Sequence, residues 1–430
     1  MKKFFCLILI FVAPFFISSV SSADESAALN EVEEDKSLRE RVERLEERLE
    51  AVEVKGEPGH RLHPVHSLYG LRISGGFTFT VQGVMNVEDK KKAEAAISAD
   101  MALEGPVGKA GRAVLVLDFQ RGAGLEGVGF ATAPNGNTTG PNGDIEAFND
   151  TNVHVTQVYY EHVFFDGALT VSLGQLDITE YFDTNEFAND ERGRFMANAF
   201  VNNPAVEFGG SEDFYSPGVR LTWSPSVAVD VTIGAFEGDG DYKGAFDSPF
   251  LMAEIGLHRE FLGREGNYRL YYWLRKERPD SSQADLADPT DPGLLRAENK
   301  GAGMSVDQSI TETLGFWLRW GLQREKVAQF KGFVGGGLNA RGGFMGRPDD
   351  VMGLGYGLSF IGEDFKRAAP SGFNPGDEHY LEVFYNFSLM GALEGRGFHV
   401  TPDLQYVMNP GGDRAAADQF IYALRLQAYF

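Results

Sequence analysis

The sequence predicts an all-β fold, a 16-stranded antiparallel transmembrane β-barrel that follows a short N-terminal coiled-coil helix. Apolar and polar residues alternate in sixteen tracts, and a period of two places successive side chains on opposite faces of a sheet. Short and long connections also alternate between the tracts, as the periplasmic turns and external loops of outer-membrane barrels do. The 52 glycines among 430 residues suit the many turns of such a chain.

Residues 1–23 have the three zones of a removable export signal. Two lysines precede an apolar stretch from Phe4 to Ile17, and small residues end the signal at Ala23. We therefore expect cleavage after Ala23. The single cysteine, Cys6, lies within this signal, so the mature chain has no thiol for a disulfide, a metal site or a nucleophile.

Residues 24–55 contain apolar residues at alternating spacings of four and three, which is the a/d seam of a coiled coil. The seam consists of Leu38, Val42, Leu45, Leu49 and Val52. Arg41 and Arg48 flank it at positions from which they can pair with Glu46 and Glu53 of a parallel partner chain. We therefore expect a homo-oligomer, most simply a trimer, with its coiled coil in the periplasm; an amphipathic helix on a surface is the alternative.

Residues 56–69 read as a linker in which His60, His63 and His66 recur at every third position. Pro64 forbids a continuous helix, but a polyproline II segment would put the three imidazoles on one side. Such an arrangement could bind a metal ion, but no cysteine or carboxylate is fixed beside the histidines, so we interpret the segment as a solvated linker, assign no metal site and predict no cofactor.

Residues 70–430 carry the strand pattern. In the last tract, apolar side chains at every second position alternate with Ala423, Arg425 and Gln427, which gives one face for outer-membrane lipid and one for a lumen. The terminal Phe430 of this tract resembles the signal that the barrel assembly machinery recognises in Gram-negative bacteria. The tracts cover approximately residues 75–87, 95–104, 112–120, 153–163, 168–176, 218–224, 227–235, 250–260, 267–277, 301–308, 313–325, 332–340, 353–363, 378–388, 398–407 and 420–430.

Charge and motifs exclude several classes of protein. The formal charge is −23, and loss of the two signal-peptide lysines makes the mature chain more acidic still, so it repels nucleic acid. Beyond the first 20 residues no apolar run approaches the ~18 residues of a spanning helix. The sequence also contains no nucleophile elbow and no His-Glu-x-x-His helix, so we do not expect an enzyme.

Four motifs resemble the carbohydrate-selective porin family. They are LGQLDITEYFDTNEFANDERGRFMANAFVNNPAVEF at residues 173–208, GVRLTWSP at 218–225, GAGMSVDQSI at 301–310 and TPDLQYVMNPGG at 401–412. They occur in the order of the family, and the resemblance covers about residues 70–430. It implies a 16-stranded barrel that lets carbohydrates and other small hydrophilic solutes diffuse passively through the outer membrane. A general cation-preferring porin without sugar specificity and a structural barrel that tethers the envelope are the alternatives.

Residues 177–217 are expected to fold into the lumen as the loop that narrows the pore. They hold nine carboxylates and two arginines, a balance of −7, and no lysine, which disfavours phosphate selectivity. The predicted loop residues that line the constriction are Asp183, Asn185, Glu186, Asp190, Glu191, Arg192 and Arg194.

The opposite wall of the pore follows from the parity of the strands. Side chains that alternate with the lipid-facing series are expected to face the lumen, namely Arg220, Arg269, Tyr271, Trp273, Arg275, Trp317, Arg319 and Arg425. Arginines facing an acidic loop would create a transverse field that orients dipolar solutes, and the two tryptophans would offer ring faces to a sugar. A register slip, or pairing of the arginines with folded loops, would remove this arrangement.

Deleting residues 24–55 should lower the stability of the oligomer in detergent and leave the barrel folded, because the coiled coil lies outside the strand pattern. The dissociation temperature of the oligomer measures the effect, and the heat-modifiable gel mobility of the barrel is the control. An oligomer of unchanged stability would mean that the helix has another partner.

Overall fold

The computed structural model describes residues 66–68, 70–85, 93–122, 153–208, 215–238, 244, 247–278, 286–342, 346–369, 371–393 and 396–430. The chain divides into two units, Met1–Lys55 and Gly56–Phe430, and every described residue belongs to the second. The predicted signal with its cleavage site after Ala23, the coiled coil of residues 24–55, and two of the linker histidines, His60 and His63, lie outside the described residues.

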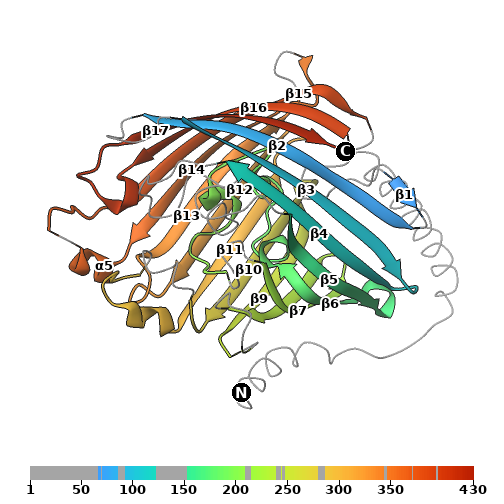
Figure 1. Ribbon diagram of the computed structural model, residues 1–430, viewed down its shortest axis with the longest axis horizontal. Helices are drawn as coiled ribbons and strands as arrows, with labels where there is room; N and C mark the ends of the chain where they lie inside the picture. Colours follow the sequence, from blue (N-terminus) through green and yellow to red (C-terminus); the bar gives the residue numbers. More distant parts are fainter. Residues whose placement is uncertain are drawn as a thin grey trace, which may run out of the picture. The chain divides into compact units, whose positions relative to one another are not determined.

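Long strands follow one another along the chain (Figure 1). They are β2 (Leu71–Met85), β3 (Ala93–Val107), β4 (Gly111–Gly122), β5 (His154–Phe164), β6 (Leu169–Asp177), β7 (Tyr215–Ser226), β8 (Val229–Glu237), β9 (Pro249–Phe261), β10 (Arg264–Arg275), β11 (Asn299–Ser309), β12 (Leu314–Gln323), β13 (Phe330–Arg341), β14 (Val351–Ile361), β15 (Glu378–Leu393), β16 (Arg396–Met408) and β17 (Gln419–Tyr429). The short elements include β1 (His66–Leu68), α4 (Asn198–Val201) and α5 (Glu363–Ala368).

The sixteen long strands form a closed barrel. Each pairs antiparallel with its neighbours in the chain, and β17 pairs with β2 to close the circle. At this seam the Phe430 N–H donates to the Gly75 carbonyl over 3.0 Å, so the last residue of the chain is part of the wall. The predicted 16-stranded antiparallel barrel is therefore confirmed, and each predicted tract overlaps one strand.

The segment before the barrel differs from the expected linker. Residues 66–68 form β1, which pairs antiparallel with the start of β2 in the register His66 to Ile73. The last part of residues 56–69 therefore adds a short strand beside the wall. The sequence pattern gave no signal for it, because three residues are too few to show a period of two.

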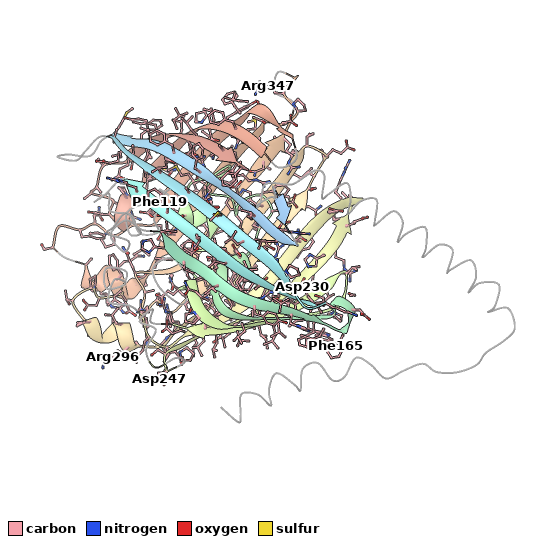
Figure 2. All side chains as sticks on the ribbon, turned by 45° about the vertical axis from the view of Figure 1, so that its right-hand side comes forward. Phe119, Phe165, Asp230, Asp247, Arg296 and Arg347 are labelled. Carbon is pink, nitrogen blue, oxygen red and sulfur yellow. The ribbon has the colours of Figure 1, made fainter. Side chains whose placement is uncertain are left out.

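Five short connections lie at one end of the barrel, and the longest connections lie at the other. Residues 108–110, 165–168, 227–228, 262–263 and 310–313 form short turns at one end. Figure 2 shows Phe165 and Asp230 near this end of the wall, and Asp247 and Arg296 at the other, where the longer connections lie. Because the strand number is even, β2 begins and β17 ends at the short-turn end.

Alternate side chains of each strand face in and out. On β10 the Leu270 side chain points outward and is 60% exposed, whereas Trp273 points inward and is 0% exposed. The outer surface is rich in exposed leucine, valine, phenylalanine and tyrosine, which suits contact with lipid. Among the described residues, no helix is both long and apolar enough to cross a membrane.

Replacing Leu424 by arginine should destabilise the barrel by about 2–4 kcal/mol, because this side chain lies on the outer face near the middle of β17. Equilibrium unfolding by guanidinium chloride in lipid vesicles measures the loss in the free energy of unfolding. Leu424→Phe is the control, because it keeps an apolar side chain at the same position. Equal stability of the two variants would mean that this face of β17 does not contact lipid.

Candidate functional site

The connection between β6 and β7 contains a long segment that folds back inside the barrel. Residues 178–208, called the inner segment here, begin with a 3-10 turn at Ile178–Glu180 and include α4. Their apolar side chains join two buried clusters with inward side chains of the wall. The barrel therefore has an interior core as well as an outer apolar surface.

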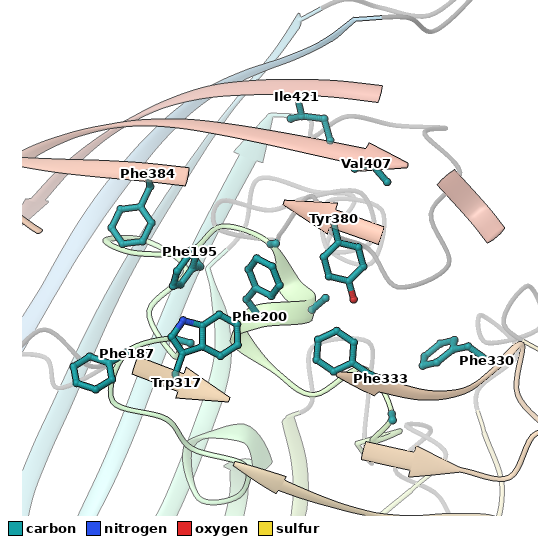
Figure 3. Close-up of a cluster of buried hydrophobic side chains, with 14 of the residues drawn as sticks. Phe187, Phe195, Phe200, Trp317, Phe330, Phe333, Tyr380, Phe384, Val407 and Ile421 are labelled. Carbon is teal, nitrogen blue, oxygen red and sulfur yellow. The ribbon is translucent and has the colours of Figure 1, made fainter. Parts of the chain in front are cut away.

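Aromatic rings attach the inner segment to the wall. The rings of Phe195 and Phe200 pack at 5.3 and 5.1 Å from the Trp317 ring of β12, between centroids, and Phe195 also meets Phe384 of β15 at 4.9 Å (Figure 3). Closer to β6, Phe182 packs edge-on against Phe236 of β8. Edge-to-face contacts of this kind add to the free energy gained by removing the rings from water.

Inward-facing glycines make room for these rings. A Cβ atom added at Gly355 of β14 would lie 2.7 Å from the Phe200 ring and 3.0 Å from the Phe195 ring. At Gly315 of β12 it would overlap the ring of Phe187. The missing side chains therefore leave a depression in the wall, and the phenylalanines of the inner segment fill it.

Arg319 joins the two halves of the inner segment on either side of its tip. Its Nε lies 2.9 Å from the Asp183 carboxylate, and both side chains are completely buried. The same guanidinium donates over 2.7 Å to the Asp183 carbonyl and also donates to the Phe200 carbonyl. Burial raises the pKa of the Asp183 carboxyl, against the opposing effect of Arg319, the Tyr271 hydroxyl and the Asn203 N–H.

Arg425 holds the tip of the inner segment in the same way. It donates to the carbonyls of Glu191, Arg192 and Arg194 over 2.6, 3.0 and 2.8 Å, and it forms an ion pair with Asp403 at 2.9 Å. These guanidinium groups therefore supply donors to main-chain oxygens that have no strand partner.

Wall carboxylates perform the complementary task for main-chain N–H groups. Glu382 of β15 accepts from the Ala197 N–H over 3.0 Å and from the Met196 N–H, and Glu254 of β9 accepts from the Asp183 N–H over 2.9 Å. The irregular backbone inside the barrel is thus hydrogen-bonded to side chains of the wall.

All eight predicted wall residues lie on the inner face. Arg269 is partly exposed, whereas the other seven are at least nine-tenths buried: Arg220, Tyr271, Trp273, Arg275, Trp317, Arg319 and Arg425. The expectation that Trp273 and Trp317 offer their ring faces to a solute requires correction. The inner segment covers both rings, and the Trp273 Nε1–H donates to the Ala205 carbonyl over 3.1 Å. Parity identified the inward face, but it could not show what covers that face.

The predicted transverse field requires a second correction. The arginines were expected to face the acidic loop across open lumen, but Arg319 and Arg425 contact the inner segment directly and pair with Asp183 and Asp403. Arg278 likewise pairs with Glu207 at 2.9 Å. The balance of −7 therefore overstates the charge that the lumen experiences, because oppositely charged groups in contact largely cancel at a distance.

The seven predicted loop residues divide by exposure. Glu186 is exposed, Glu191 and Arg192 are partly exposed, and the remainder are buried, namely Asp183, Asn185, Asp190 and Arg194. Asp190 has a local role, since its carboxylate accepts from the backbone N–H of Gly193 over 2.8 Å and stabilises the turn at the tip.

A chain of charged side chains on β3 to β7 was missed by the sequence analysis. Arg112 bonds to Glu104 over 3.0 Å and to Glu161 over 2.8 Å, and Arg220 bonds to Glu161 over 2.7 Å. The Arg220 guanidinium also lies 3.9 Å from the centroid of the Tyr181 ring. Inward parity on these strands could have identified Arg112 and Glu161. Among the described residues, no group of three or more His, Cys, Asp or Glu side chains is placed to hold a metal ion.

Replacing Arg319 by methionine should destabilise the protein by about 3–5 kcal/mol, because the change leaves the buried Asp183 carboxylate without its ion-pair partner. Arg319→Met combined with Asp183→Asn should recover part of that loss. Unfolding in guanidinium chloride gives both values, and single-channel recordings should show a noisier open current when the inner segment is loosened. Equal losses in the single and double variants would contradict the anchoring role of the charges.

Known proteins resemble this chain both in sequence and in fold. An uncharacterised protein from Aquifex aeolicus is 28% identical over 237 residues, which are 55% of this chain and 59% of the relative's length. Porin B of Pseudomonas aeruginosa is 24% identical over 327 residues, covering 64% of this chain and 68% of that protein. The high-pH structure of Pseudomonas putida OprB shares the fold, with a TM-score of 0.67 and 18% identity over 84% of this chain and 94% of that one. A family model matches residues 117–430, and the chain therefore belongs to the carbohydrate-selective porin, OprB, family.

Proposed function

We propose that the chain forms a pore in the bacterial outer membrane through which carbohydrates and other small hydrophilic solutes diffuse passively. The observation that carries this proposal is the inner segment, which is fixed to a closed barrel by aromatic packing and buried ion pairs. A segment anchored in this way narrows the lumen permanently and does not need a solute to order it. Family and fold both point to a channel and not to an enzyme.

The constriction is proposed to lie between the inner segment and the wall of β3 to β7. The anchoring contacts of the segment are mainly with β9 to β17, which places those strands behind it. The chain of Glu104, Arg112, Glu161 and Arg220 lies on the other side, and Arg112 retains 42% of its side-chain exposure. Polar groups on both sides of the gap suit a hydrated path.

The charge of this path favours cations over anions. Glu180 and Glu186 of the inner segment are exposed, and Glu104 is partly exposed. On the same wall as Glu104 the one partly exposed arginine of the charge chain is Arg112, whereas Arg319 and Arg425 are buried behind the segment. Neutral sugars experience little of this net charge, so the same path admits them. This distribution also gives weight to the second candidate, a general cation-preferring porin without sugar specificity.

The remaining assignments are part of the same proposal. The exposed apolar outer face is proposed to contact outer-membrane lipid, and the terminal strand to be recognised by the barrel assembly machinery. A homo-oligomer joined by the periplasmic coiled coil, and a tethering role for that coil, both depend on residues 24–55, which lie outside the described residues.

Replacing Glu180 and Glu186 together by glutamine should reduce the cation preference, because both carboxylates are exposed on the inner segment. Reversal potentials across a salt gradient measure it, and Glu312→Gln is the control, since this 82% exposed carboxylate lies in a short turn. Swelling of proteoliposomes in neutral sugars of increasing size tests the solute class.

Each result separates the candidates. Anion preference in the unmodified protein would contradict the proposed charge of the path. Ion conductance without sugar uptake would support the general cation pore, and the absence of both would support a structural barrel.

A further inference from the structure

Four uncharged polar side chains form a row across neighbouring strands of the inner wall. Gln427 of β17 stands opposite Thr78 of β2, Thr78 opposite Ser98 of β3, and Ser98 opposite Gln120 of β4. All four have inward parity, because the alternate residues Phe77 and Phe79 are exposed on the outer face. At a strand separation of about 4.8 Å the row extends over about 14 Å, more than the width of one sugar ring.

Each side chain of this row has one buried polar atom without a partner among the described residues. Thr78, Ser98 and Gln427 are each exposed by 1% or less. Within the described part of the chain, four atoms of the row have no hydrogen-bonding partner: Gln427 Nε2, Thr78 Oγ1, Ser98 Oγ and Gln120 Oε1. The second atoms of the two amides are engaged, since Gln427 Oε1 accepts from Thr401 and Gln120 Nε2 donates to Asp118.

Leaving buried polar groups without partners destabilises a protein, so a row of them suits a partner that the described residues do not supply. Valine or alanine would fill the same positions without this loss. The next row repeats the feature, because Thr80 stands opposite Arg425 and its Oγ1 also lacks a partner among the described residues.

The tip of the inner segment lies over this part of the wall. Arg425 of β17 binds the carbonyls of Glu191 and Arg192, and the Arg192 side chain reaches β3, where it forms an ion pair with Asp100. Asp100 is two residues from Ser98 on the same strand, and therefore on the same face. The Arg192 side chain thus crosses from β17 to β3 beside the row, and its contact with Asp100 fixes this side chain there, while Arg425 holds the backbone of the tip.

The chemistry of the row selects the class of ligand. It offers amide N–H donors at one end, hydroxyls in the middle, which both donate and accept, and an amide oxygen at the other end. None of the four groups is charged, so an ion that bound here would lose hydrating water and gain only neutral hydrogen-bonding partners. A polyhydroxylated neutral solute can donate and accept at every position.

We propose that the row from Gln427 to Gln120 is a binding track for the hydroxyl groups of a neutral sugar, and that the track opens when Arg192 leaves Asp100. This inference rests on the proposed function and adds a location to it. The track lies on β17 to β4, beside the tip of the inner segment, and is separate from the chain of charges that includes Arg112 and Arg220.

The test replaces the hydroxyls while conserving shape. In planar bilayers, the half-blocking concentration of maltose should rise about three- to tenfold in a Thr78→Val, Ser98→Ala double variant, because two neutral hydrogen bonds are lost. Ion conductance and the thermal stability of the barrel should not fall, since neither hydroxyl has a partner among the described residues. Thr232→Val is the control for a buried inward hydroxyl outside the row; this hydroxyl bonds to Thr222 over 3.0 Å, so a loss of stability without a change in maltose block is expected for it.

A second variant tests the opening step. Asp100→Asn removes the ionic contact of Arg192 and should increase the rate at which maltose blocks the channel. An unchanged rate would overturn the role of the tip. Unchanged half-blocking concentrations in the double variant, or an equal change in Thr232→Val, would overturn the track itself. Failure of the unmodified protein to admit glucose or maltose into liposomes would instead overturn the proposed pore function.

Discussion

The architecture depends on one constraint, which is that buried backbone groups of an irregular segment inside a closed barrel, where they are not paired within the segment, must be hydrogen-bonded by the wall. A wall of strands has no free main-chain donors, because each strand pairs on both sides. Side chains must therefore supply them. Arg319 and Arg425 donate to carbonyls of the inner segment, and Glu382 and Glu254 accept from its N–H groups. Arg319, Arg425 and Glu382 each bond to more than one main-chain group, and the two arginines also have a carboxylate partner.

Polar anchoring and apolar packing alternate along the same strands. Two positions separate Trp317 from Arg319 on β12, so both face inward, and one packs against phenylalanines while the other binds carbonyls. Inward glycines such as Gly355 provide the space for the rings. The wall behind the inner segment thus resembles the core of a soluble protein, with buried charged groups that bond to backbone or to each other. Such packing makes the segment a fixed part of the barrel.

The strands could be predicted from sequence because lipid on one side and polar groups on the other impose a period of two on each of them. Parity also indicated which residues point inward. It could not indicate what they meet, because that depends on residues far apart in the chain, such as Asn185 and Ser305, whose side chains bond over 3.1 Å. The prediction that Trp273 and Trp317 face inward was therefore correct. They pack against the inner segment, however, and not against a solute. The charge of the inner segment was likewise read from its composition, although pairing with distant arginines decides how much of it remains.

The pairing of buried charges also decides which groups act on a solute in the pore. A guanidinium that touches a carboxylate and several carbonyls contributes little field beyond a few ångströms, since the opposite charges and dipoles around it cancel its own at a distance. The groups that act on a passing solute are then the partly exposed ones, the carboxylates at the edge of the inner segment and the Arg112 and Glu104 side chains opposite. In the chain that links Arg112 to Arg220, Glu161 lies between the two arginines, so the chain also carries its own counter-charge. A lumen of this kind exerts only a modest net force on ions, while it presents hydrogen-bonding groups on every side. Such a balance suits the passage of neutral, hydroxyl-rich molecules. They replace hydrogen bonds to water by hydrogen bonds to the wall, and they have no charge that would have to be desolvated.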